Sequence, residues 1–78
     1  MFITIDTNTD DNTGSIIGGA THIDVYNHGS QEASIIIDGQ TIPIPTKIGW
    51  SSGYRSSGFS NIRYNAQAGS RLIIIAWD

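Results

Sequence analysis

Hydrophobic and polar residues alternate along much of this chain, with short β-branched blocks between the alternating stretches. Residues 21–27 alternate most clearly, with Ile23 and Val25 on one side of an extended strand and polar or aromatic side chains on the other. No window keeps the spacing of an amphipathic helix for more than two turns, and Ile, Val, Thr and Ser outnumber Ala, Leu, Glu and Lys. The pattern predicts an all-β chain.

Turn residues divide the chain into about seven short strands. We expect strands at residues 2–5, 21–27, 33–37, 40–44, 48–50, 60–64 and 71–77, besides a brief one at 15–17. Strands of this length and spacing are typical of a small antiparallel sandwich or a jelly-roll-like barrel, and the pattern leaves that choice open. Residues 1–78 then form a single β domain, in which 6–14 is a polar loop or an N-terminal arm.

The dipeptide Asp38-Gly39 lies between two apolar runs and is the strongest hairpin signal in the chain, because both residue types tolerate a positive φ. Pro43 and Pro45 follow on the second strand of this hairpin. Proline has no backbone N–H to donate, so this strand is predicted to lie at the edge of its sheet.

Two blocks, 35–37 and 72–77, are apolar at every position, so each strand has a second apolar face. The residues of this second face are Ile36, Ile73, Ile75 and Trp77. At ~1.5–3 kcal/mol for each buried large side chain, their burial would contribute on the order of 6–12 kcal/mol, which rivals the ~5–15 kcal/mol stability of a whole domain. Either a two-layer sandwich uses both faces of its central strands, or these four residues form an oligomer interface.

Composition narrows the class of protein. The chain has 78 residues and a formal charge of −3, and its length allows one small core. Because it has no cysteine, neither disulfides nor thiolate metal sites can stabilise that core, and oligomerisation is the favoured alternative. Its four basic residues are scattered, which argues against nucleic-acid binding. We expect no signal peptide, and the longest apolar run, 72–77, is far too short to span a membrane as a helix.

Residues with metal-binding or catalytic chemistry form no complete site in the sequence. Oxygen-bearing side chains alternate from Asp6 to Asn12 as in a calcium loop, but the glycine and the bidentate glutamate that such a loop needs are missing. His22, Asp24 and His28 lie close in sequence without the spacing of a zinc site. No serine has the setting of an activated nucleophile. We therefore expect no metal, no cofactor and no enzymatic activity.

Residues 50–59 contain two Ser-Ser-Gly-aromatic units in tandem. Rigid aromatic side chains among small, adaptable residues are typical of recognition surfaces. We predict that this loop contacts a partner through Trp50, Tyr54, Arg55 and Phe59. The alternative is that Trp50 and Phe59 only cover the open end of the core.

Three segments in order carry a resemblance to a known class of protein: residues 26–30 (YNHGS), 33–39 (ASIIIDG) and 62–74 (IRYNAQAGSRLII), with a short proline-bearing strand after the second. Over residues 21–77 this arrangement resembles small β-rich virion proteins of tailed bacteriophages, such as capsid decoration (cement) proteins and head or tail accessory proteins. The resemblance implies a homo-oligomer, with a trimer favoured, that is made in the host cytoplasm and binds other virion proteins such as the major capsid protein. It carries over no catalytic residues.

Two functions from different classes remain open. The first is a structural virion protein that assembles as an oligomer and stabilises or decorates a phage capsid or tail. The second is a carbohydrate- or receptor-binding β module that uses the aromatic loop from Trp50 to Phe59.

Overall fold

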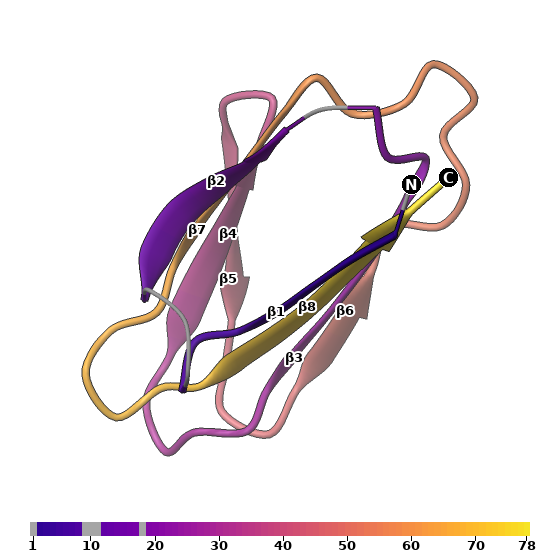
Figure 1. Ribbon diagram of the computed structural model, residues 1–78. Coiled ribbons are helices and arrows are strands. Elements are labelled where there is room, and N and C mark those ends of the chain that lie inside the picture. The colour runs from indigo at the N-terminus through magenta and orange to yellow at the C-terminus, as the bar shows by residue number, and fades with distance from the viewer. Residues whose placement is uncertain (1, 9–11, 18) are drawn as a thin grey trace.

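The computed structural model describes residues 2–8, 12–17 and 19–78, and for Ile17 the backbone alone. Within these ranges the chain forms eight strands and no helix. The strands form two four-stranded antiparallel sheets that pack face to face as a sandwich (Figure 1). The predicted all-β class is confirmed, and of the two architectures left open the structure shows the sandwich.

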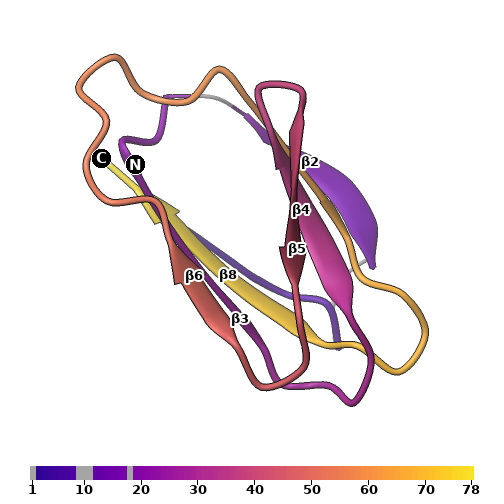
Figure 2. The same cartoon turned by 180° about the vertical axis from the view of Figure 1, so that it is seen from behind.

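The two sheets have the strand orders β1-β8-β3-β6 and β2-β7-β4-β5. The first sheet contains β1 (Phe2–Asp6), β8 (Leu72–Trp77), β3 (His22–Asn27) and β6 (Gly49–Ser51). The second sheet contains β2 (Thr13–Ile17), β7 (Asn61–Asn65), β4 (Ala33–Ile37) and β5 (Gln40–Ile44). Because β1 pairs with β8 from Phe2 opposite Trp77 onward, the two ends of the chain lie side by side (Figures 1 and 2).

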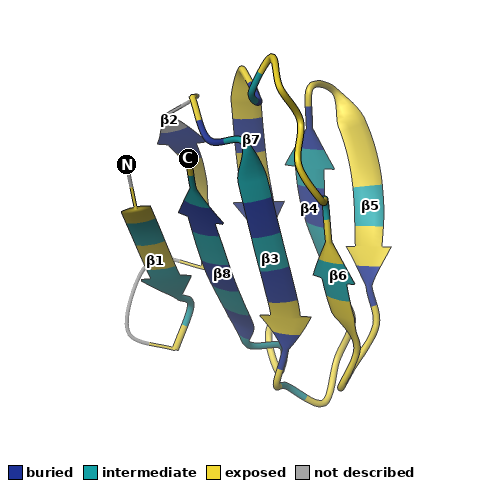
Figure 3. Cartoon of the chain, turned by 90° about the vertical axis from the view of Figure 1, so that its right-hand side faces the viewer, coloured by how far each residue is buried: buried dark blue, intermediate teal, exposed yellow. Residues whose placement is uncertain are grey.

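The core lies between the sheets and is built from alternate positions of the central strands, as Figure 3 shows by the banding of β3, β4, β7 and β8. The largest fully buried apolar side chains are Ile23, Ile35, Ile44, Ile62, Leu72 and Ile74. Each contributes about 2 kcal/mol of hydrophobic stabilisation. The inward and outward assignments predicted for residues 21–27 are confirmed, and β7 alternates in the same way, with Ile62 and Tyr64 buried.

The hairpin β4–β5 has the predicted turn. Asp38 and Gly39 adopt φ values of 48° and 84°, and the register places Ile37 opposite Gln40. These positive φ values match the right-handed twist of the flanking strands. β5 lies at the edge of its sheet, as Pro43 predicted, and Pro45 follows the end of the strand.

The loop within the polar segment 6–14 is shorter than predicted, because both ends of the segment belong to strands. Asp6 belongs to β1, while Thr13 and Gly14 belong to β2 and pair with Asn65 and Tyr64. The start of β2 was hard to predict because it lies at a sheet edge and begins with Thr13, Gly14 and Ser15, which show no apolar alternation. Residues 9–11 of this segment lie outside the described residues.

Asn27 is a fully buried polar residue at the end of β3 that the sequence analysis did not single out. Its Nδ2 donates to the carbonyl oxygens of Gln31 and Ile44 at 2.7 and 3.0 Å. Its Oδ1 accepts from the backbone N–H groups of Gly29 and Arg71 at 2.9 and 3.2 Å. Through these four bonds Asn27 ties the first sheet to the second at this end of the sandwich.

Candidate functional site

The outer face of the first sheet carries a row of aromatic rings. Phe2 and His22 flank Trp77 in the register of β1, β8 and β3. The rings of His22 and Trp77 are stacked, with 4.9 Å between centroids and an interplanar angle of 4°. Tyr54, from the loop after β6, extends the row with its ring 5.3 Å from His22. Four residues distant in sequence thus form one aromatic strip, in which ring contacts join Trp77, His22 and Tyr54, and Phe2 lies beside Trp77 by its register.

Apolar residues continue from this strip along β8. Ile73, Ile75 and Trp77 occupy its three outward positions and are half-buried. Tyr26 lies beside Ile73 on β3 and meets the His28 ring edge-on at 4.3 Å. We call this surface the aromatic face; its apolar and aromatic residues are Phe2, His22, Tyr26, Tyr54, Ile73, Ile75 and Trp77. Two polar residues, Thr4 and Asp24, lie on it on either side of Ile75. Phe2, Tyr54 and Tyr26 are 71%, 67% and 38% exposed, so its ends are more open to solvent than its centre.

An ion pair lies at the edge of the aromatic face. The Arg71 guanidinium binds the Asp6 carboxylate in a bidentate manner, with Nε–Oδ1 and Nη2–Oδ2 distances of 3.0 and 2.7 Å. Hydrogen bonding from Arg71, assisted by the backbone N–H of Asn8, lowers the pKa of Asp6 from 3.8 to about 2. This pair fixes the end of β1 to the start of β8.

The outer face of the second sheet is polar by contrast, and Ile36 lies there. The structure therefore corrects the grouping of Ile36 with Ile73, Ile75 and Trp77, because the two sets lie on opposite outer sides of the sandwich. Beside Ile36 in the register are Arg63 and Thr41. We call this surface the polar face; its other outward residues are Thr13, Ser15, Ser34, Pro43, Asn61 and Asn65. Neither outer face is covered by a third layer within the described chain, so the second face of β8 is not buried in the chain's own core.

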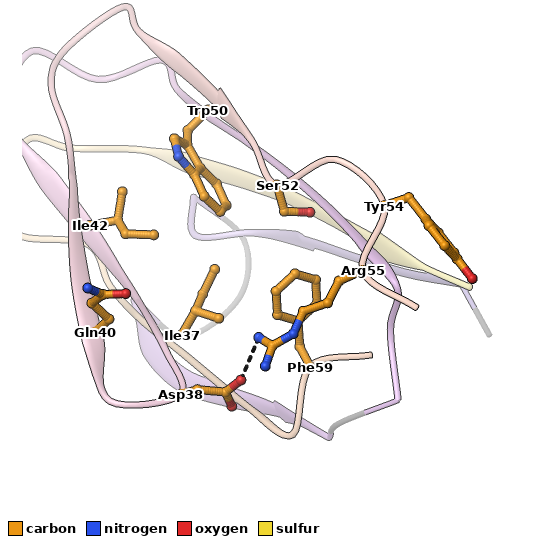
Figure 4. Close-up of a pocket in the computed structure, with 9 residues that line it drawn as sticks. All are labelled: Ile37, Asp38, Gln40, Ile42, Trp50, Ser52, Tyr54, Arg55 and Phe59. Atoms are coloured by element: carbon orange, nitrogen blue, oxygen red, sulfur yellow. Dashed lines mark hydrogen bonds and ion pairs between the residues drawn. The ribbon is translucent and has the colours of Figure 1, made fainter. Parts of the chain in front are cut away.

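A pocket of about 510 Å³ lies at the open side of the sandwich, between the edge strands β5 and β6. Its apolar part is formed by Ile37, Ile42, Trp50 and Phe59, and its polar part by Asp38, Gln40, Ser52, Tyr54 and Arg55 (Figure 4). β5 and β6 follow one another in the chain but belong to different sheets, so no strand pairing closes the gap between them. The pocket is a consequence of this topology.

An ion pair spans one end of the pocket and joins the two sheets. Arg55 Nη1 donates to Asp38 Oδ2 at 2.8 Å. Asp38 Oδ1 accepts from Ser60 Oγ at 2.8 Å and from the Asn61 N–H at 2.9 Å. The bond from Ser60, with those from Asn61 and Arg55, lowers the pKa of Asp38. The Arg55 guanidinium also lies 4.9 Å from the centroid of the Phe59 ring, within reach of a cation–π contact.

The four predicted partner-contact residues all line this pocket, but they differ in exposure and direction. Phe59 is buried and Trp50 is half-buried against the core, so both also cover the core as the alternative interpretation expected. Arg55 is exposed on the rim. The Tyr54 side chain turns away from the centre of the pocket (Figure 4) and lies against His22 instead. Tyr54 therefore connects the pocket to the aromatic face.

Three polar residues of the pocket, Asp38, Gln40 and Ser52, were not predicted as contact residues from the sequence. Asp38 was assigned to a turn, and no local pattern marks its partner Arg55, which is 17 residues away. Gln40 has no signal of its own, because one glutamine at the start of a strand is common on any surface. The positions of Asp38 and Gln40 follow from the hairpin register, which brings them to the same opening.

The described residues contain no group of three or more His, Cys, Asp or Glu side chains placed to hold a metal ion. His22 and Asp24 lie on the outer side of β3, as expected, and His28 follows that strand. Among residues 2–8, 12–17 and 19–78 there is also no helix long and apolar enough to cross a membrane.

Comparison with protein-family models, with curated proteins and with solved structures finds no match to this chain. The function has to be inferred from the surfaces described above.

Proposed function

We propose that this chain is a structural virion protein that assembles as a homo-oligomer through its aromatic face and stabilises or decorates a phage capsid or tail. The observation that carries the assembly is the continuous apolar surface of Ile73, Ile75 and Trp77 with the aromatic row beside it. The virion context is supported by the resemblance of residues 21–77 to small phage virion proteins.

The size of the molecule indicates how much of the aromatic face is engaged. A standard stable interface buries about 800 Å² on each partner. The isolated chain exposes 4373 Å², so such an interface takes roughly a fifth of its surface. The three outward residues of β8 are too few for that area. The contact therefore extends to Phe2 on β1 and Tyr26 on β3, across most of the sheet.

The charges favour a second copy of the chain as the partner that covers the aromatic face. The aromatic face carries two carboxylates: Asp6 is neutralised by Arg71, and Asp24 lies beside Ile75. The whole chain has a net charge of only −3, so two identical faces repel one another weakly. Closed, symmetric homo-oligomers are also the commonest assemblies of soluble proteins. In a trimer, which the resemblance favours, the three copies of this face would meet around the threefold axis.

Sedimentation equilibrium over a range of micromolar concentrations tests the assembly. We expect a discrete oligomer, heavier than the 8.4 kDa chain. A folded monomer that persists at every concentration would exclude self-association as the role of the aromatic face.

The genes beside the one that encodes this chain test the virion context separately. A major capsid or tail gene next to it would support the proposal. A neighbourhood of chromosomal metabolic genes would argue against a virion protein while leaving the assembly itself standing.

A further inference from the structure

We propose that the pocket between β5 and β6 is a binding site for a neutral saccharide. This proposal concerns a different surface from the aromatic face and does not depend on assembly. The pocket, at about 510 Å³, lies in the usual range of ~300–1,000 Å³ for small-molecule sites, which combine an apolar floor with a few polar groups.

The floor of the pocket is formed by side chains that the core holds in place. Ile37 and Phe59 are buried, and Trp50 packs against the core while one side of its indole borders the opening. In Figure 4 the side chains of Trp50, Ile37 and Phe59 border a common space. Aromatic faces with a negative quadrupole attract the weakly positive C–H groups on the flat side of a pyranose ring. Trp50 is the residue placed to stack on such a ring.

The rim supplies donors and acceptors together. A guanidinium has five N–H donors, and within the described chain only Nη1 of Arg55 is engaged. Asp38 Oδ2 accepts one bond, which leaves further acceptor capacity on that oxygen. The exposed Gln40 amide offers both a donor and an acceptor at the same opening. A sugar hydroxyl donates and accepts at once, so neighbouring hydroxyls fit this mixture.

Charge balance indicates that the ligand is neutral. Asp38 and Arg55 are the charged residues of the pocket lining, and they neutralise one another across a distance of 2.8 Å. A phosphate or carboxylate ligand would have to compete with Asp38 for Arg55 and would be repelled by the carboxylate that it displaces. A purely aliphatic ligand would leave the polar rim without partners, at a cost in free energy.

Backbone hydrogen bonds hold the loop that carries Arg55 in position before any ligand binds. The Arg55 N–H donates to the carbonyl of Thr21 at 3.0 Å, and the Phe59 N–H donates to that of Ala20 at 2.8 Å. The Gly58 N–H closes the loop on Arg55 at 2.9 Å. A site fixed in this way loses less conformational entropy on binding.

Titration with the methyl glycosides of glucose, galactose, mannose and N-acetylglucosamine, followed by ¹H–¹⁵N NMR, tests the proposal. At least one glycoside should shift the Trp50 indole and Gln40 side-chain signals, with a dissociation constant on the order of millimolar. Glucuronate serves as the anionic comparison and should bind more weakly than the neutral glycosides. No saturable shift with any glycoside, shifts centred outside the pocket, or preferential binding of glucuronate would overturn the proposal.

Variants locate the binding. Gln40→Ala should weaken it about tenfold, the effect of losing bonds worth ~1.4 kcal/mol. Its matched control is Thr41→Ala, the next residue on β5 and outward on the polar face, which should change nothing. Trp50→Leu, once NMR shows that it is folded, should abolish the shifts. Equal losses in Gln40→Ala and Thr41→Ala would contradict the site.

An Ile75→Lys monomer should bind the glycoside like the parent chain, which separates this test from the assembly test.

Discussion

The two outer faces of this sandwich start from similar sequence blocks and become different surfaces. On β8 the outward positions are Ile73, Ile75 and Trp77 in succession, and aromatic rings from β1 and β3 flank Trp77. On β4 a single isoleucine, Ile36, faces outward with polar neighbours on either side. An apolar run in the sequence therefore defines a contact surface only where the neighbouring strands continue it.

The largest expected effect compares the same substitution on the two faces. Ile75→Lys places an ammonium group in the centre of the aromatic face, between Thr4 and Asp24. Assembly would have to remove this ammonium and the Asp24 carboxylate from water, a cost that exceeds their mutual attraction, and the association should weaken by at least about a hundredfold. Ile36→Lys on the polar face should leave the association unchanged. Sedimentation equilibrium of the two variants measures this difference, and equal weakening by both would remove the distinction between the faces.

Asn27→Ala should destabilise the whole sandwich and not one outer face, because Asn27 links the two sheets. The substitution leaves the carbonyls of Gln31 and Ile44 and the N–H groups of Gly29 and Arg71 without their side-chain partner. We expect the free energy of unfolding to fall by about 3 kcal/mol. Urea denaturation measures it. A loss below ~1 kcal/mol would mean that Asn27 is not the main link at this end.

Trp77→Ala sharpens the comparison within the aromatic face. It removes the ring that lies between Phe2 and His22 in the aromatic row and that stacks on His22. The association should weaken about tenfold, less than for Ile75→Lys, because truncation removes apolar area without burying a charge. Arg63→Ala, on the polar face, is the control and should have no effect on the association constant. A stronger effect from Arg63→Ala would reverse the assignment of the two faces.

The smallest expected effect concerns acid. Because the pKa of Asp6 is lowered from 3.8 to about 2 in the folded chain, its contribution to stability is fully present above about pH 4 and is lost as the pH falls through about 2. Asp6→Asn should remove this part of the pH dependence, leaving that of Asp38 and Asp78, whose pKa values are also lowered. Denaturant midpoints measured over this pH range for both chains provide the test. Parallel pH profiles would show that the Asp6–Arg71 pair does not stabilise the fold.

Much of the fold could be predicted because its signals are local. The Asp38-Gly39 turn, the alternation of residues 21–27 and Pro43 of β5 each depend on neighbours in sequence. The sequence grouped Ile36 with Ile75 but could not show that they lie on opposite outer faces, because periodicity gives the side of a strand but not which sheet the strand joins. The Asp38–Arg55 pair escaped detection for the same reason, since it joins residues of different sheets.

The most direct test of the central claim is the solvent exposure of the isoleucine methyl groups in the assembled protein, measured by NMR with a soluble paramagnetic agent. The account predicts that the methyls of Ile73 and Ile75 become protected as the concentration rises, while those of Ile36 stay as accessible as in the monomer. Unchanged accessibility of Ile73 and Ile75, or protection of Ile36 in their place, would contradict it.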